Sequence, residues 1–190
     1  MKRIIGCFIV LLLIVNLAAI AAEQKICVVD MDKVFNSYYK TKLEDAKIKK
    51  QTEVFKDYLK KQTDARGKIE ASFVELRDAS QNIGLSDVER ENKRIEAQDK
   101  YRELQAKDVE IQQYNQQKRQ FIVNEYERIR KELIKEITTV IQSRAKREGC
   151  TFVLDYSGNS MNNIPTVVYY DQATDITDAV LKEVNLGHGS

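Results

Sequence analysis

From Asp32 to Glu148 the chain contains no proline, and the only glycines in this stretch are Gly67 and Gly84. Proline breaks helices and glycine weakens them. A stretch of this length with no proline and only two glycines therefore predicts helix. The composition agrees, because 32% charged residues and a single proline suit long, solvated helices better than a thick globular core. We therefore expect a predominantly helical chain in which residues 34–148 form the main helical part.

The helical stretch carries one pair of end signals, near residues 82–86. Ser86 and Glu89 match a capping box, in which the serine hydroxyl and the glutamate satisfy free backbone N–H groups. Gly84 is placed to take the left-handed conformation that ends many helices. These signals predict an antiparallel helical hairpin with its tip at residues 82–86 and arms about 70 and 90 Å long.

Apolar residues recur at helical spacing on both arms, but unevenly. The stripe of the second arm is continuous from Ile122 to Ile141 and thins between Glu96 and Gln120. We expect firm packing near the base and local mobility toward the tip. The seam of the first arm follows heptad spacing, with small residues in its second row, and should pack closely. Its rows are Ile48, Phe55, Gln62, Ile69, Leu76, Ile83 and Tyr58, Ala65, Ser72, Ala79.

Short β-rich segments flank the hairpin. Lys25–Asp30 predicts a buried strand, Phe152–Tyr156 and Thr166–Tyr170 predict two more, and a short helix opens near Asp175, capped by Asp175 or Thr174. The fold class is therefore α+β: a long antiparallel hairpin, 34–148, projecting from a small β-sheet body of residues 23–33 and 149–185, with a disordered tail at 186–190. The strand residues expected to build the body are Ile26, Val28, Val29, Phe152, Val153, Leu154, Val167, Val168 and Tyr169.

The N-terminus has the pattern of a secretory signal peptide at residues 1–22. Lys2 and Arg3 precede an apolar run that ends at Ala19-Ile20-Ala21-Ala22, a small-residue cleavage site. Two alternatives stay open. The run is nearly long enough for a permanent membrane anchor, and Cys7 follows a lipobox-like sequence with little apolar chain before it. Export favours the periplasm, with no membrane-spanning segment after cleavage.

Cys27 and Cys150 remain after cleavage, and an exported chain can keep a disulfide. We expect the strands before and after the hairpin to be antiparallel, which places the two residues at opposite strand ends and beyond disulfide reach. This favours two buried free thiols. Pairing between subunits is the alternative.

Charge and residue types argue against several functions. The chain has 31 Lys and Arg against 29 Asp and Glu, and loss of Lys2 and Arg3 leaves 29 of each, so a nucleic-acid partner is not expected. The only histidine, His188, stands near the C-terminus without a neighbouring cysteine, and no metal-binding spacing or phosphate-cradling glycine loop is present. We expect no enzyme activity, no metal and no cofactor.

Three segments, taken in order, resemble the Skp/OmpH family of periplasmic chaperones. Residues 25–35 are similar to that family's opening strand and helix start, residues 152–155 to the strand after its hairpin, and residues 168–181 to its closing strand and helix. The resemblance implies a homotrimer whose strands form an intersubunit barrel. It also implies that the arms enclose unfolded outer-membrane β-barrel proteins and prevent their aggregation without ATP.

The neutral mature chain departs from the basic character of well-studied family members, so no lipopolysaccharide site is carried over. Apolar arm residues are the candidate client contacts, although each also fits the hairpin seam. They are Phe73, Leu76, Tyr101, Leu104 and Tyr114. The alternative function is that of an envelope coiled-coil adaptor that binds one specific folded partner.

Overall fold

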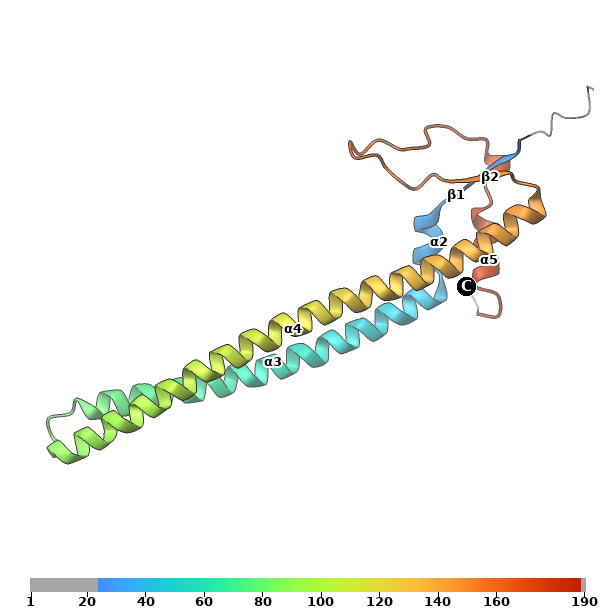
Figure 1. Ribbon diagram of the computed structural model, residues 1–190. Coiled ribbons are helices and arrows are strands. Elements are labelled where there is room, and N and C mark those ends of the chain that lie inside the picture. The colour runs from blue at the N-terminus through green and yellow to red at the C-terminus, as the bar shows by residue number, and fades with distance from the viewer. Residues whose placement is uncertain (1–23, 189–190) are drawn as a thin grey trace, which may run out of the picture. The chain divides into compact units, whose positions relative to one another are not determined.

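The computed structural model describes residues 24–188, and the predicted signal peptide lies outside them. The described chain divides into two compact units, which we call the body (residues 24–39 and 134–188) and the arm (Lys40–Leu133). The elements in order are β1 (Ile26–Val29), α2 (Met31–Ser37), α3 (Tyr39–Ser80), α4 (Asp87–Glu148), β2 (Phe152–Asp155), the 3₁₀ turn η1 (Gln172–Thr174) and α5 (Thr177–Val184) (Figure 1). The predicted class, predominantly helical α+β with a long helical hairpin, is confirmed.

Helices α3 and α4 run antiparallel to each other in the arm (Figure 1). Side chains join them along its length: Arg66 pairs with Asp108 at 2.9 Å, and the rings of Phe73 and Tyr101 lie 5.5 Å apart. Predicted seam residues of α3 are mostly half-buried, whereas Ile83 at the tip is 92% exposed. The seam is therefore formed largely by side chains that keep part of their surface in water.

Burial along α4 within the arm has a gap in its middle. On the side of the gap toward the tip, Ala97 and Leu104 are buried, and on the side toward the body, Ile129 and Leu133 are buried. The 24 residues between Leu104 and Ile129 contain no buried side chain. Packing is firm from Ile129 onward, whereas the first part of the stripe predicted to be continuous, Ile122 to Tyr126, lies in the stretch without buried side chains. Packing is therefore weakest in the middle of the arm rather than at its tip.

The tip is closed by the predicted capping box. The Ser86 hydroxyl accepts from the Glu89 N–H, and the Glu89 carboxylate accepts from the Ser86 N–H at 3.0 Å. The prediction of a left-handed Gly84 is wrong, because its N–H instead donates to the Asn82 side chain at 2.9 Å in a local turn. A left-handed glycine instead ends α4: Gly149 has a φ of 71°, and the following Cys150 N–H donates to the Ala145 carbonyl.

Strands β1 and β2 are paired in parallel, so the expected antiparallel arrangement is wrong. The reason is that α4 is 62 residues long and α3 only 42. The end of α4 passes the whole of α2 and β1, from Glu136 beside Tyr38 to Glu148 beside Lys25. The chain then reverses at Gly149 and runs back along β1.

Cys27 and Cys150 form a disulfide, with their Cα atoms 5.8 Å apart. The expectation of two free thiols is therefore wrong. In the parallel register Cys27 faces Val153, and the Thr151 N–H bonds the Lys25 carbonyl, so Cys150 lies at the start of β1. The distance argument failed because it rested on the wrong strand direction.

The body core lies between β1, α2, α5 and the last turns of α4. Cys27, Val34, Ile137, Val180 and Thr177 are almost fully buried. Thr177 links the elements, because its hydroxyl accepts from the Asp30 N–H at 2.9 Å and donates to the Asp175 carboxylate. Asp175 also accepts from the Thr177 N–H at 2.8 Å, but the N-cap residue of α5 is Ile176, so neither predicted cap, Asp175 or Thr174, holds that position.

The first arm helix does not begin as one piece, because Tyr38 interrupts it in extended conformation. The Asn185 side chain spans the break, accepting from the Tyr39 N–H at 2.9 Å and donating to the Ser37 carbonyl at 3.2 Å. The predicted disordered tail is ordered as far as His188, whose ring stacks on Tyr39 with 3.7 Å between centroids.

The strand predicted at Thr166–Tyr170 is absent from the described chain, so Val167, Val168 and Tyr169 are not strand residues. They belong to a long loop between β2 and η1 that extends away from the strands (Figure 1). Val168 and Tyr169 are each 87% exposed. Only the start of this segment is paired, because the Thr166 N–H donates to the Gly158 carbonyl at 3.0 Å. A strand needs a ladder of backbone hydrogen bonds, and within the described residues none joins residues 167–170 to a neighbouring segment.

Candidate functional site

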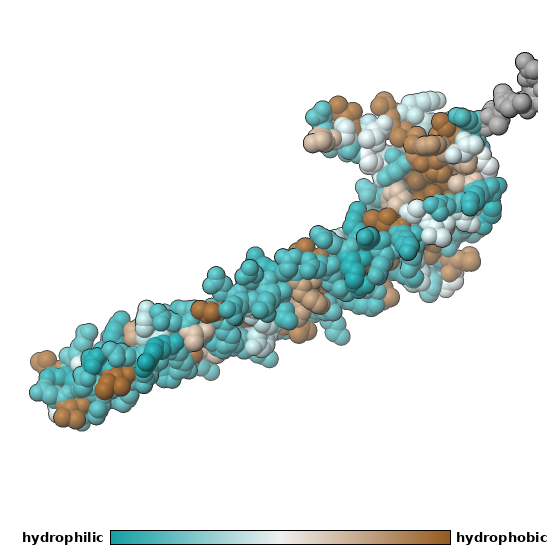
Figure 2. All heavy atoms as spheres, viewed as in Figure 1, coloured by the Kyte–Doolittle hydropathy of each residue, from teal (hydrophilic) through white to brown (hydrophobic). Residues whose placement is uncertain are grey.

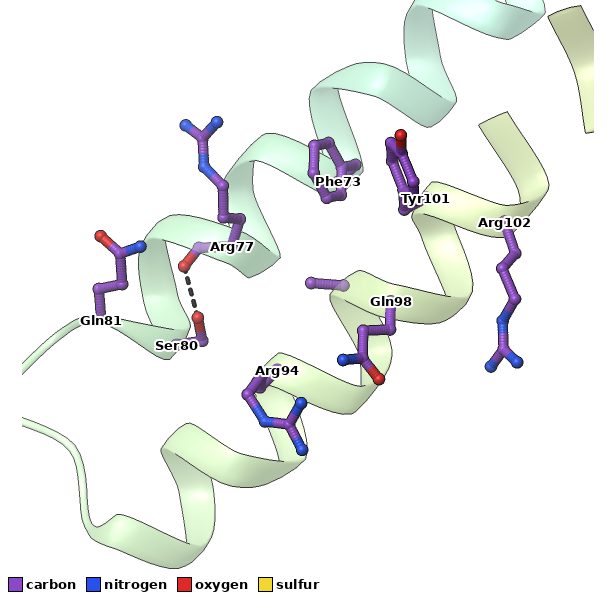
Figure 3. Close-up of a pocket in the computed structure, with 9 residues that line it drawn as sticks. Phe73, Arg77, Ser80, Gln81, Arg94, Gln98, Tyr101 and Arg102 are labelled. Atoms are coloured by element: carbon purple, nitrogen blue, oxygen red, sulfur yellow. Dashed lines mark hydrogen bonds between the residues drawn. The ribbon is translucent and has the colours of Figure 1, made fainter. Parts of the chain in front are cut away.

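A pocket of about 720 Å³ opens between the outer parts of α3 and α4. Figure 3 shows Phe73 of α3 and Tyr101 of α4 facing each other at its inner end, with arginines from both helices around it. The Arg77 guanidinium lies 5.9 Å from the centre of the Phe73 ring, which is cation–π distance. This pocket combines aromatic surface with hydrogen-bond donors, a pairing suited to a polypeptide segment.

The arginines of this outer pocket are engaged with neighbouring carboxylates. Arg77 pairs with Asp78 at 2.8 Å, and Arg94 and Arg102 pair with acidic residues three positions earlier on α4. Arg94 lowers the pKa of Glu91 through their hydrogen bond. The charges of the outer pocket are therefore largely balanced within the arm itself.

A second pocket, of about 510 Å³, lies in the middle of the arm. Its aromatic wall comes from Phe55 on α3 and Tyr114 on α4, and the Lys118 ammonium lies 5.0 and 5.5 Å from the centres of these two rings. Burial raises the pKa of the Tyr114 hydroxyl, and the nearby Tyr58 adds to the effect.

The five predicted client-contact residues are placed differently by the structure. Phe73 and Tyr101 line the outer pocket, Tyr114 lines the middle pocket, and Leu76 is half-buried in the seam. Leu104 is only 7% exposed and packs inside the hairpin. The five residues are thus spread over two pockets and the seam rather than gathered at one site.

Residues missed in the sequence surround Tyr114. Phe55 and Tyr58 were assigned to the seam only, and Phe121 was not singled out, yet their rings form one cluster with Tyr114. The available signal was the spacing, since positions 55 and 58, like 114 and 121, fall on one helix face.

The body presents a second apolar surface. Strand β2 has β1 on one side and no strand of the described chain on the other. Its Phe152 is 62% exposed and Leu154 38%, and the following loop adds the exposed Met161, Val168 and Tyr169. Figure 2 shows hydrophobic side chains gathered near the strands of the body. An open strand edge with apolar side chains is a surface suited to association.

Several polar side chains of the body form hydrogen bonds and ion pairs with one another, and these contacts join its elements. Hydrogen bonding with Tyr170 and burial raise the pKa of Tyr156, whose hydroxyl donates to Asp175 at 3.2 Å. Arg144, with help from Lys25, lowers the pKa of Glu148. Within residues 24–188 no cluster of three metal-ligating side chains occurs, and no helix is long and apolar enough to cross a membrane.

A long helical hairpin joined to a small parallel strand pair defines the fold class of this chain. The family model described as outer membrane protein (OmpH-like) matches residues 25–184. The chain therefore belongs to the OmpH-like family.

A crystal structure from Caulobacter crescentus, described as a candidate outer membrane chaperone (OmpH-like), has the same fold. It aligns with a TM-score of 0.65 at 20% identity, covering 86% of this chain and 85% of its own. No curated protein matches the chain.

Proposed function

We propose that this protein is an ATP-independent periplasmic holdase, which binds unfolded outer-membrane β-barrel proteins between the arms of a homotrimer. The observation that carries the proposal is the exposure of large apolar side chains along the arm. Val54 is 58% exposed, Tyr101 47% and Phe121 45%. Membership of the OmpH-like family supports the same class of function.

The arm surface is suited to weak binding at many points. Its exposed apolar side chains stand singly among ion pairs such as Lys93–Glu96, Lys100–Glu103 and Lys107–Glu110 (Figure 2). Each apolar contact contributes little, and many together retain a client that exposes apolar surface throughout. A client whose strands find better partners in a membrane then leaves without an energy source.

Assembly is supported by the body. A single chain leaves the β2 edge unpaired and Phe152 in water. Association through this edge would satisfy backbone groups and bury apolar area together. A trimer would surround a space with three arms, which one hairpin cannot do.

The test is sedimentation equilibrium of the mature protein, alone and with an outer-membrane β-barrel protein diluted from urea. We expect a trimer that keeps the barrel protein in a soluble complex without nucleotide. A monomer or dimer that leaves the client to aggregate contradicts the proposal. Tight binding of one folded envelope protein without protection of unfolded clients would indicate the adaptor function instead.

A pair of matched variants connects the activity with the exposed arm residues. Tyr101→Ser with Phe121→Ser should weaken protection in a light-scattering assay, because it removes two exposed aromatic rings. Gln112→Ser with Gln113→Ser, which changes two exposed polar residues of the same helix, should leave protection unchanged. Equal protection by both variants would contradict a role for the apolar arm surface.

A further inference from the structure

The middle pocket of the arm differs from the rest of the hairpin in its charge. Its cations are Lys56, Lys118 and Arg119, and no acidic residue lines it. None of the three forms an ion pair within the described chain. The outer pocket is the internal comparison, because its arginines are paired with carboxylates.

The sequence explains why Lys118 and Arg119 are unpaired. An arginine or lysine on a helix is normally neutralised by a carboxylate three or four residues away. Around Lys118 those positions hold Tyr114, Asn115, Phe121 and Ile122, and none of the positions around Arg119 is acidic. Residues 111–124 contain no Asp or Glu at all.

The facing stretch of α3 is also basic. Residues 49–62 contain five lysines and two acidic residues, a net charge of +3, and residues 111–124 add +2. The two stretches face each other, because Phe55 contacts Tyr114 and Phe121 across the hairpin. The middle of the arm therefore carries +5 in a mature chain whose net charge is zero.

The two aromatic rings that line the pocket, Phe55 and Tyr114, each contact a further ring beside it. Tyr58 lies 4.4 Å from Tyr114, and Phe121, which is 45% exposed, meets Phe55 edge-on at 6.0 Å. The pocket also falls within the part of α4 that has no buried side chain. An incoming ring would thus gain stacking contacts without displacing a packed core.

We propose that this pocket binds a segment of unfolded polypeptide in which an aromatic side chain stands next to carboxylates. The ring packs against Phe55 and Tyr114, and the carboxylates pair with Lys118 and Arg119. The proposal rests on the holdase function and gives it a preferred client sequence. A polypeptide is favoured over an anionic lipid because the walls are aromatic rings, which prefer ring partners, and because exposed Val54 and Val123 extend the apolar surface along the arm for a longer chain.

The first experiment measures binding of the full mature protein to three fluorescent, end-blocked peptides in a Gly-Ser background. One carries Asp-Phe-Asp, one Asn-Phe-Asn and one Asp-Ala-Asp at the centre. We expect the first to bind about tenfold more tightly than either of the others, with an affinity that falls as salt rises. Equal binding of all three peptides overturns the proposal. So does binding of phosphatidylglycerol vesicles without binding of the first peptide.

Two double variants then locate the site. Lys118→Gln with Arg119→Gln should lower the affinity for the Asp-Phe-Asp peptide about tenfold, since glutamine keeps the helix and removes both charges. Lys60→Gln with Lys61→Gln removes the same amount of charge from the facing stretch of α3, outside the pocket lining, and should change the affinity less than about twofold. Equal losses of peptide affinity in the two variants would mean that the peptide is attracted by the overall positive charge of the arm, and would overturn the assignment of the site to this pocket.

The client assay separates this inference from the proposed function. If the wild-type protein protects unfolded barrel proteins but the pocket variant protects acidic-aromatic clients equally well, the pocket assignment fails and the holdase function stands. If the wild-type protein protects no client at all, the proposed holdase function is contradicted, and with it the client preference that rests on it.

Discussion

The sulfur atoms of Cys27 and Cys150 are bonded, so the first strand and the chain after α4 are joined across 123 residues. The disulfide therefore closes a covalent loop that contains the whole helical hairpin. Cys27 is fully buried. A cross-link over so long a loop restricts the unfolded chain strongly.

Replacement of both cysteines by alanine should lower the free energy of unfolding by about 2–5 kcal/mol. The measurement is urea unfolding of the mature protein followed by circular dichroism. Wild-type protein with reductant should unfold like the variant, and denatured wild-type protein without reductant should show no reactive thiol. Two reactive thiols in the denatured, unreduced protein would contradict the disulfide.

Ser86→Ala should loosen the tip of the arm, because the Glu89 N–H loses its acceptor and the capping box opens. A cap of this kind contributes about 1 kcal/mol to its helix. Amide hydrogen exchange at residues 87–90 should quicken, while exchange at residues 137–141 stays unchanged. Unchanged exchange at the tip would show that the cap contributes nothing there.

The same cap should respond to pH. Hydrogen bonds from the Ser86 hydroxyl and N–H lower the pKa of Glu89. A lowered pKa in the folded state means that the cap stabilises the tip above the ordinary glutamate pKa and is lost as pH falls through the folded value. NMR titration should give Glu89 a lower midpoint in the wild-type protein than in Ser86→Ala, and equal midpoints would contradict this cause.

Asn185→Ala should destabilise the body by about 1–2 kcal/mol, because the half-buried Tyr39 N–H and the Ser37 carbonyl lose their partner at the break between α2 and α3. Thermal unfolding measures the change. Asn124→Ala is the matched control, since Asn124 only accepts from the exposed Gln120. A loss no greater than in the control would mean that water replaces the Asn185 side chain.

Phe152→Asp tests the body surface as the assembly interface. Phe152 is 62% exposed in the single chain, and a charge there would be buried without a partner in any assembly through β2. Sedimentation should show monomers, with unchanged helix content by circular dichroism. Val88→Asp, on a 71% exposed residue at the tip, should leave the assembly as it is in the wild-type protein. Retention of the wild-type assembly by Phe152→Asp would place the interface elsewhere.

The aromatic part of the candidate site could be predicted from the sequence, whereas its cations could not be predicted from the net charge of the whole chain. Phe73, Tyr101 and Tyr114 were selected from the apolar stripes, and each lines an arm pocket. Lys118 and Arg119 were missed because the mature chain was treated as neutral throughout. Counting charge over residues 111–124 would have revealed them, since whether a cation is paired depends on its neighbours within one helical turn.

The sequence by itself determined the features that depend on neighbouring residues: two long helices, the Ser86–Glu89 box, the short helix after Asp175 and the two strands around the hairpin. Only the tertiary structure decided the parallel direction of β1 and β2, the Cys27–Cys150 bond, and the break at Tyr38 spanned by Asn185. These features depend on where residues more than a hundred positions apart meet. The place where they meet depends on how far α4 extends past the start of α3. Local sequence patterns predict each helix but not this difference in length, so they do not predict the direction of β2 relative to β1.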